Sequence, residues 1–177
     1  MSQKGVATFA GGCFWCTEAI FTRLKGVEKI ISGYAGGKLE KPSYEQVSRG
    51  NTGHAEAIQI TYDPKIISYE DLLYIFWRTH DPTTINRQGA DVGPQYRSVI
   101  FYADEAQRKA AHSSLEEAQK LFKNPIVTEI LPFESFYKAE DYHQNYYSKD
   151  PKKSYCRLVI DPKINKLQKD FKNYLKG

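Results

Sequence analysis

Apolar and polar residues alternate along residues 56–63 ("EAIQITYD"), the two-residue period of a strand with one buried face. Residues 96–102 ("YRSVIFY") predict a second strand, and residues 127–131 ("VTEIL") a third, which Pro132 ends. Near the start, residues 6–12 ("VATFAGG") predict a short strand that runs into a Gly-Gly turn.

Five further segments space their apolar residues as helices do. In chain order these segments are 13–24, 68–81, 104–122, 139–147 and 164–175. Ser68 stands three residues before Asp71, the spacing of a capping box, in which two side chains bond backbone N–H groups at the helix start. Gly26 suits the end of the first helix, because glycine tolerates the left-handed backbone found there.

Strands that alternate with helices predict a sheet covered by helices. Because some strands alternate apolar and polar residues, one sheet face is less buried than the other, which favours antiparallel pairing over a doubly wound parallel sheet. We therefore expect an α+β fold: a two-layer α/β sandwich with a mixed, largely antiparallel sheet and a ferredoxin-like core. With 177 residues and no repeat or Gly/Ser linker, the chain predicts a single domain over residues 1–177.

Composition and charge exclude several classes of protein. The net charge is +4, and residues 149–177 hold nine Lys or Arg against three Asp, a basic C-terminal segment. No recognition motif accompanies these cations, so we expect a solvated helix and no nucleic-acid partner. No apolar run approaches the roughly 20 residues that span a bilayer, so we expect no membrane contact. The N-terminus lacks a signal-peptide pattern, which predicts a cytoplasmic protein.

The three cysteines are too few for a secreted disulfide scaffold. Cys13 and Cys16 form a C-x-x-C, which can be a dithiol redox centre, half of a metal site, or two buried apolar residues. A structural zinc site normally uses two close pairs of ligands. The remaining candidates form no second pair, so we expect no metal; they are Cys156, His54, His80, His112 and His143.

Cys13 follows a predicted strand and two glycines and stands at the start of a predicted helix. Unpaired N–H groups and the positive end of the helix dipole favour an anion at this place. A thiol there can have its pKa lowered from about 8.5 to roughly 3.5–7.5. The local pattern thus predicts a reactive Cys13, but it leaves open a thioredoxin-like dithiol oxidoreductase and an inert buried cysteine.

Seven segments, taken together and in order, narrow these alternatives. They are "GGCFWCTEAIF" (11–21), "GYAGG" (33–37), "PSYEQV" (42–47), "GHAEAIQITYDP" (53–64), "FWRTHDPTT" (76–84), "QGADVGPQYRS" (88–98) and "AEDYHQNYY" (139–147). In these segments the chain resembles the A type of peptide methionine sulfoxide reductase, which reduces the S epimer of methionine sulfoxide. The resemblance runs from about residue 6 to beyond residue 156.

The resemblance implies a nucleophile and an acid. Cys13 matches the family's nucleophile, whose thiolate attacks the sulfoxide sulfur. Glu56 matches the family's acidic residue, which protonates the leaving oxygen. A free glutamate has a pKa near 4.3 and is mostly ionised at pH 7, so burial must raise the pKa of Glu56 for this role.

Further matches surround these two residues. Tyr44 and Tyr96 match tyrosines whose hydroxyls bond the polarised oxygen, and Asp91 matches an aspartate that orients the substrate. Phe14 and Trp15 match the pocket for the substrate's methyl group. The histidines in matching segments receive no catalytic role.

The resemblance also implies a recycling path. Cys13 becomes a sulfenic acid, condenses with a second thiol to a disulfide, and is restored by thioredoxin without a bound cofactor. Cys156 matches the place of the family's C-terminal resolving cysteine, although "RLVIDPK" replaces the usual glycines after it. Cys16 is the alternative, but side chains three apart on a helix lie about 5–6 Å apart at Cβ, and a disulfide needs roughly 3.5–4.5 Å. We favour Cys156, and a relay through both thiols stays open.

Overall fold

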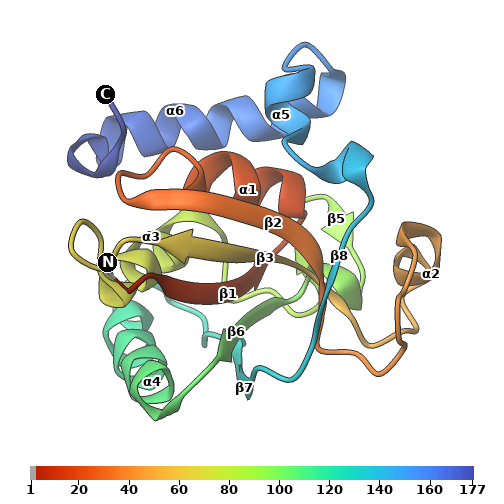
Figure 1. The fold of residues 1–177 in the computed structure, drawn as a ribbon, viewed down its shortest axis with the longest axis horizontal. Helices are drawn as coiled ribbons and strands as arrows, with labels where there is room; N and C mark the ends of the chain where they lie inside the picture. Colours follow the sequence, from red (N-terminus) through yellow and green to blue (C-terminus); the bar gives the residue numbers. More distant parts are fainter. Residues whose placement is uncertain (1–2) are drawn as a thin grey trace.

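The computed structural model describes residues 3–177, so the first two residues of the expected 1–177 domain lie outside it. A curled six-stranded sheet forms its centre (Figure 1). Its strands are β1 (Gly5–Gly11), β2 (Val27–Ala35), β3 (Ala55–Tyr62), β6 (Ser98–Tyr102), β7 (Glu129–Pro132) and β8 (Phe136–Lys138). They lie in the order β7-β6-β1-β3-β2-β8, and all neighbours pair antiparallel except β6 and β7. The expected α+β class with a mixed, largely antiparallel sheet is confirmed.

The helices are α1 (Phe14–Phe21), α2 (Tyr44–Ser48), α3 (Tyr69–Thr79), α4 (Glu105–Gln119), α5 (Tyr146–Lys149) and α6 (Asp161–Asp170). Three of the five expected helices, α1, α3 and α4, form where the spacing predicts them. The capping box before α3 is confirmed, because Ser68 and Asp71 each bond the other's backbone N–H. A small hairpin of β4 (Arg87–Gln88) and β5 (Asp91–Val92) stands apart from the sheet.

Two expectations near the C-terminus are wrong in part. Residues 139–147 do not form one helix, because Asn145 adopts a left-handed backbone with φ 54° between the 3-10 turn Asp141–His143 and α5. The last helix starts earlier than expected, at Asp161, and a π-helical turn over Cys156–Ile160 leads into it. The sequence pattern also did not reveal β2 and β8, which pair with each other at the edge of the sheet.

Each face of the sheet has its own core. On the helix side, the Phe9 ring of β1 lies 5.9 Å from Phe21 of α1 and 4.9 Å from Phe76 of α3. The other face is lined mainly by small residues: Ala10, Ala35, Ala55, Ala57 and Val99. Burial of each large aromatic stabilises the fold by roughly 1.5–3 kcal/mol.

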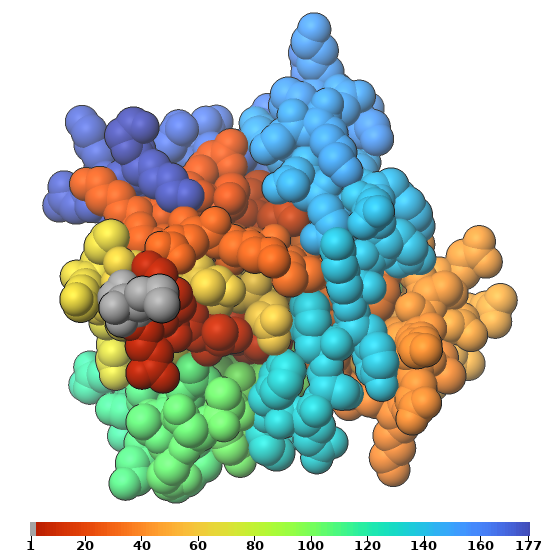
Figure 2. Space-filling view, viewed as in Figure 1, coloured from red at the N-terminus to blue at the C-terminus, as the bar shows by residue number. Residues whose placement is uncertain are grey.

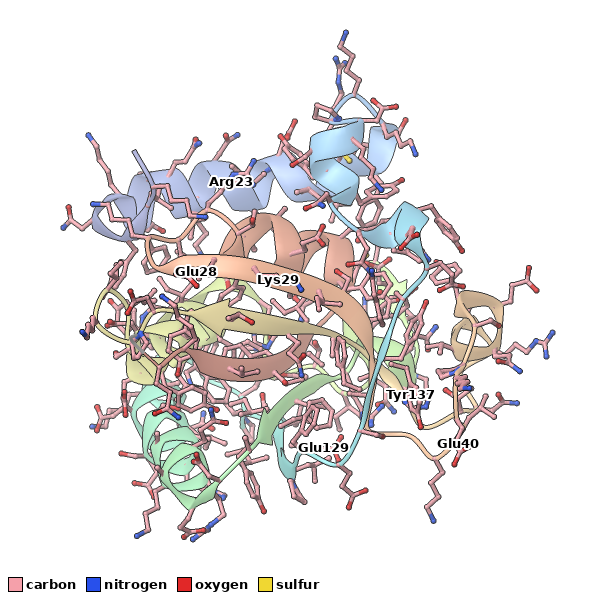
Figure 3. The ribbon with its side chains drawn as sticks, in the orientation of Figure 1. Arg23, Glu28, Lys29, Glu40, Glu129 and Tyr137 are labelled. Atoms are coloured by element: carbon pink, nitrogen blue, oxygen red, sulfur yellow. The ribbon has the colours of Figure 1, made fainter. Side chains whose placement is uncertain are left out.

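The sheet curls because its two edge strands are joined by residues 133–135 alone. Glu129 on β7 and Tyr137 on β8, which form opposite edges, are labelled in Figure 3. The alanines on the inner face leave room for Phe133 in the connection and for Phe136 at the start of β8, which pack against them. The curl thereby closes the face that carries no helix.

The C-terminal segment lies over α1 (blue in Figure 2). Its end is tied to the chain that follows α1: the Lys25 N–H donates to the Tyr174 carbonyl at 2.7 Å, and the Lys176 N–H to the Arg23 carbonyl at 2.9 Å. Arg23, labelled in Figure 3, also places its guanidinium 5.1 Å from the Tyr147 ring. Within residues 3–177, no helix has the length and apolar character needed to cross a membrane.

Candidate active site

Cys13 stands at the junction of β1 and α1, as the sequence predicts. It is the residue just before the first turn of α1, with φ −60° and ψ 128°, and its carbonyl accepts the N–H of Cys16 at 3.0 Å. Gly12 before it has φ +96°, a conformation that side chains rarely adopt. The Gly-Gly turn therefore aims the cysteine at the open N-terminal end of the helix.

We expect Gly12→Ala to lower the free energy of unfolding by about 1–3 kcal/mol, through backbone strain. An added Cβ would also meet Gln88 Cγ at 2.7 Å. Gln88 cannot swing away easily, because its amide bonds both the N–H and the carbonyl of Asp81 at 2.9 Å. Urea denaturation measures the change in the free energy of unfolding.

Gly89→Ala is the matched control, with φ +59° and nothing within 4 Å of the added Cβ. Equal losses in the two variants would show that the contact with Gln88 is unimportant.

Glu56 lies directly beside Cys13. Its side chain lies on the helix side of β3, the face that also carries Ile58 and Ile60. Its Oε1 accepts the N–H of Phe14 at 3.1 Å. Burial raises the pKa of Glu56 from 4.5 to about 8, although the hydrogen bonds from the Phe14 N–H and the Cys13 thiol oppose the rise. At neutral pH this carboxyl is therefore mostly protonated, which is the state that the proton-donor role expected from the sequence requires.

The side chains of Cys13 and Cys16 pack in one apolar cluster, and each changes the pKa of the other. Burial raises the pKa of Cys13, and the negative charge of Glu56 adds to the rise. The neighbouring Cys13 side chain lowers the pKa of Cys16 to about 7, and the positive charge of Lys163 acts in the same direction. The expected lowering of the pKa of Cys13 by the helix end is therefore not found, because burial raises that pKa; the thiol whose pKa is lowered is Cys16.

Tyr44 and Tyr96 flank the same carboxyl. Tyr44 opens α2, and its backbone N–H donates to Glu140 Oε2 at 2.9 Å. Tyr96 ends the 3-10 turn Pro94–Tyr96. Burial raises the pKa of both hydroxyls, and the next largest cause at each is the charge of Glu56, so both phenols stay protonated donors near that carboxyl.

Asp91 reaches the site through a tyrosine that the sequence reasoning missed. Its Oδ2 accepts the hydroxyl of Tyr155 at 2.7 Å, and the Tyr155 oxygen lies 3.6 Å from Cys16 Sγ. Burial raises the pKa of Tyr155, so the phenol keeps its proton. Asp91 thus orients Tyr155 beside the thiol pair.

Phe14 and Trp15 begin α1 and form an aromatic cluster with residues from the C-terminal half. The Trp15 indole N–H donates to His143 Nδ1 at 3.0 Å, and the Tyr146 ring stacks on Trp15 at 3.7 Å with a 5° interplanar angle. Phe14, fully buried, lies 5.0 Å from the His143 ring. Burial lowers the pKa of His143, so this imidazole is neutral and accepts through Nδ1. The segment "YHQNYY" was the only sequence signal for these partners.

Cys156 joins the thiol pair from the far end of the chain. It starts the π-helical turn, is 0% exposed, and packs in one apolar cluster with Cys13, Cys16 and Ile160. All three thiols are free and buried. The tertiary structure therefore gathers into one place every residue that the sequence proposed for catalysis or resolution.

Comparison with known proteins gives this site its context. Residues 5–175 match the family model described as peptide methionine sulfoxide reductase. The chain is 54% identical over 166 residues to the peptide methionine sulfoxide reductase MsrA of Sulfolobus acidocaldarius. This match covers 94% of each protein.

Two solved structures of Mxr1 are also similar to this chain. Mxr1 from Saccharomyces cerevisiae in reduced form is similar with a TM-score of 0.81 and 39% identity, covering 87% of this chain and 90% of Mxr1. Mxr1 in complex with Trx2 matches with a TM-score of 0.58 and 31% identity, covering 81% and 85%. A family match over nearly the whole length and a relative at 54% identity give one conclusion. The chain belongs to the peptide methionine sulfoxide reductase family.

Proposed function

We propose that this chain reduces methionine S-sulfoxide, free or in proteins, to methionine, with Cys13 as the nucleophile and Glu56 as the acid. One observation carries the proposal: a buried carboxyl with a pKa of about 8 lies beside a thiol at a helix start, in an aromatic cluster. Exchange between thiols and disulfides needs no such proton donor. Removal of a sulfoxide oxygen does, because an oxide ion is a poor leaving group.

In the first step, the Cys13 thiolate attacks the sulfoxide sulfur and forms an S–S bond, and Glu56 gives its proton to the oxygen. The hydroxyl then moves to the Cys13 sulfur as the substrate S–O bond and the S–S bond break. One electron pair forms the new S–O bond of the sulfenic acid, the other stays on the substrate sulfur, and methionine leaves. The substrate sulfur gains two electrons and the Cys13 sulfur loses two. The proton released when the Cys13 thiol ionises restores Glu56, so that atoms and charge balance.

The surrounding residues position the sulfoxide. Tyr44 and Tyr96 donate hydrogen bonds to its oxygen, which strengthen as negative charge develops there. Phe14 and Trp15 hold the methyl group of the substrate. Because a methyl group buries little area, this pocket contributes more to selectivity than to affinity. Asp91 acts through Tyr155, which it bonds at 2.7 Å.

The sulfenic acid then condenses with a second thiol and releases water. Cys156 is the resolving thiol that the sequence favours, and the contact between Cys13 and Cys16 supports a relay that ends on it. Because Cys13 precedes the helix and has an extended backbone, the separation expected between helical residues does not apply, and both side chains lie in one apolar cluster. Cys16, whose pKa is lowered to about 7, attacks Cys13 first as a thiolate, and Cys156 then attacks Cys16.

Thioredoxin reduces the final disulfide by thiol exchange. The similarity to Mxr1, which has been solved in complex with Trx2, supports this partner. We further propose a single domain over residues 1–177 with a basic segment at 149–177, acting in the cytoplasm. The strand order β6-β1-β3-β2, with α1 and α3 on one face, supports the ferredoxin-like two-layer core.

One experiment tests this function: the fully reduced protein is mixed with excess methionine S-sulfoxide and no reductant. We expect two methionines per chain, because the relay moves the disulfide to Cys16–Cys156 and frees Cys13 for a second turnover. Cys16→Ser and Cys156→Ser should each release one. Peptide mapping by mass spectrometry locates the disulfide, and the R epimer is the control substrate.

Other outcomes are equally informative. One methionine per wild-type chain with a Cys13–Cys156 bond would remove the relay and leave Cys156 as the direct resolving thiol. Failure to release methionine, with turnover of a disulfide substrate instead, would favour a general dithiol oxidoreductase and overturn the proposed function.

A further inference from the structure

Glu18 is a second buried carboxyl near the site, and the reaction above does not use it. It lies on α1, 4% exposed, three residues after Trp15. Its Oε1 accepts the backbone N–H of Tyr146 at 3.2 Å, and its Oε2 accepts the Ser32 hydroxyl at 3.2 Å. Burial raises the pKa of Glu18, while these hydrogen bonds and one from the Asn145 backbone oppose the rise.

The backbone that Glu18 holds is an unusual corner. Asn145 has the left-handed φ of 54°, and its side chain does not cap α5. The first N–H groups of a helix have no partner within the helix, so Glu18 supplies the acceptor that Tyr146 lacks. The preceding Gln144 fixes the other side of the corner, because its amide bonds both the N–H and the carbonyl of Ser32 at 2.9 Å.

The corner carries the ring that covers Trp15. Tyr146 stacks on the indole at 3.7 Å, and Lys153 lies 4.7 Å above the Tyr146 ring. Stacking on Tyr146 fixes the plane of the Trp15 indole, and the hydrogen bond to His143 fixes its rotation within that plane. Without Glu18, the half-buried N–H of Tyr146 would lose its acceptor within the protein, and the corner would relax.

We propose that Glu18 is a positioning residue for substrate binding: through the backbone of Tyr146 it fixes the wall of the methyl pocket at Trp15. The inference deepens the proposed function and rests on it. Glu18 makes no contact with the reacting atoms in this scheme. It acts before chemistry, by holding the pocket in the shape that accepts the substrate.

The test compares two substitutions in the full-length protein. Glu18→Ala removes the acceptor, and we expect KM for a peptide S-sulfoxide to rise about tenfold, with kcat within about twofold of the wild type. Glu18→Gln keeps an acceptor for the Tyr146 N–H, and its amide can donate to the Ser32 oxygen, so KM should stay close to wild type. Ser32→Ala is the matched control, because it removes the other hydrogen bond to Glu18 and leaves the corner held.

A double-mutant cycle separates positioning from general stability. If Glu18 acts through Tyr146, then Glu18→Ala combined with Tyr146→Leu raises KM no further than the larger single change. Tryptophan emission should shift in Glu18→Ala, because Trp15 loses its stacked ring, and should stay unchanged in Glu18→Gln.

An unchanged KM in Glu18→Ala, with only a lower melting temperature, would overturn the inference and leave Glu18 a stabilising residue. Additive effects in the cycle would overturn the route through Tyr146. A wild-type protein that fails to reduce the sulfoxide would instead contradict the proposed function, so the two failures are distinguishable.

Discussion

Cys13→Ser is expected to abolish sulfoxide reduction, lowering the single-turnover rate by on the order of 10⁴-fold or more. The nucleophile must donate an electron pair and keep the oxygen, and an alcohol does neither at neutral pH. Quenched-flow measurement of methionine released by the reduced protein gives the rate. The substitution nearly preserves volume, so the melting temperature should change little.

The matched controls are Cys16→Ser and Cys156→Ser, which leave the nucleophile in place. Both should keep the first turnover, because resolution follows the release of methionine. Substantial release by Cys13→Ser, together with a loss in Cys16→Ser, would move the nucleophile to the thiol with the pKa of about 7.

Glu56→Gln is expected to slow the same step by roughly 10²- to 10⁴-fold, the usual contribution of a positioned general acid. Glutamine keeps the oxygen that accepts the Phe14 N–H at 3.1 Å, so the start of α1 stays in place. What it loses is the transferable proton. Glu117→Gln is a suitable control, since Glu117 is an exposed carboxyl on α4 that pairs only with Lys120 among the ion pairs of the described residues.

The pH dependence of the rate provides a second readout. The active form of Glu56 is the protonated one, so the wild-type single-turnover rate should fall as the pH rises through about 8, the pKa of that carboxyl. Glu56→Gln should lack this limb of the profile. A glutamine variant with an unchanged rate and the same fall above pH 8 would remove Glu56 from the role of acid.

In Glu56→Gln, stability should change in the opposite direction to activity. The pKa of Glu56 is higher in the folded chain than its ordinary value of 4.5, so protonation stabilises the fold below that value. This contribution is lost as the pH rises from 4.5 to about 8. Glutamine does not titrate, and thus the melting temperature of Glu56→Gln should exceed that of the wild type most clearly at pH 8 and above.

Local patterns predicted the parts of the site that depend on neighbouring residues alone. A strand, two glycines and a helix place Cys13 at the helix start. The alternation in 56–63 predicted a strand, but by itself it favoured a solvated carboxylate at Glu56; the structure places Glu56 on the buried face with Ile58 and Ile60. The resemblance supplied what periodicity does not, namely which of thirteen tyrosines belong near these two residues.

The C-terminal half was predicted less well. The spacing in 139–147 favours a helix, but tertiary contacts outweigh it: Gln144 bonds Ser32 across the sheet edge, and Asn145 turns the chain with φ 54°. The same corner stacks Tyr146 on Trp15, which lies 131 residues before it in the sequence. No local rule connects segments so far apart.

The sequence by itself determined the fold class, the position of Cys13 at a helix start and the family of the chain. Only the tertiary structure decided the electrostatics: burial raises the pKa of Glu56 to about 8, and the neighbouring Cys13 lowers the pKa of Cys16 to about 7. The physical reason is that backbone geometry follows from near neighbours, whereas desolvation depends on everything packed around a group. A pKa is thus a property of the assembled core, which the order of residues does not reveal.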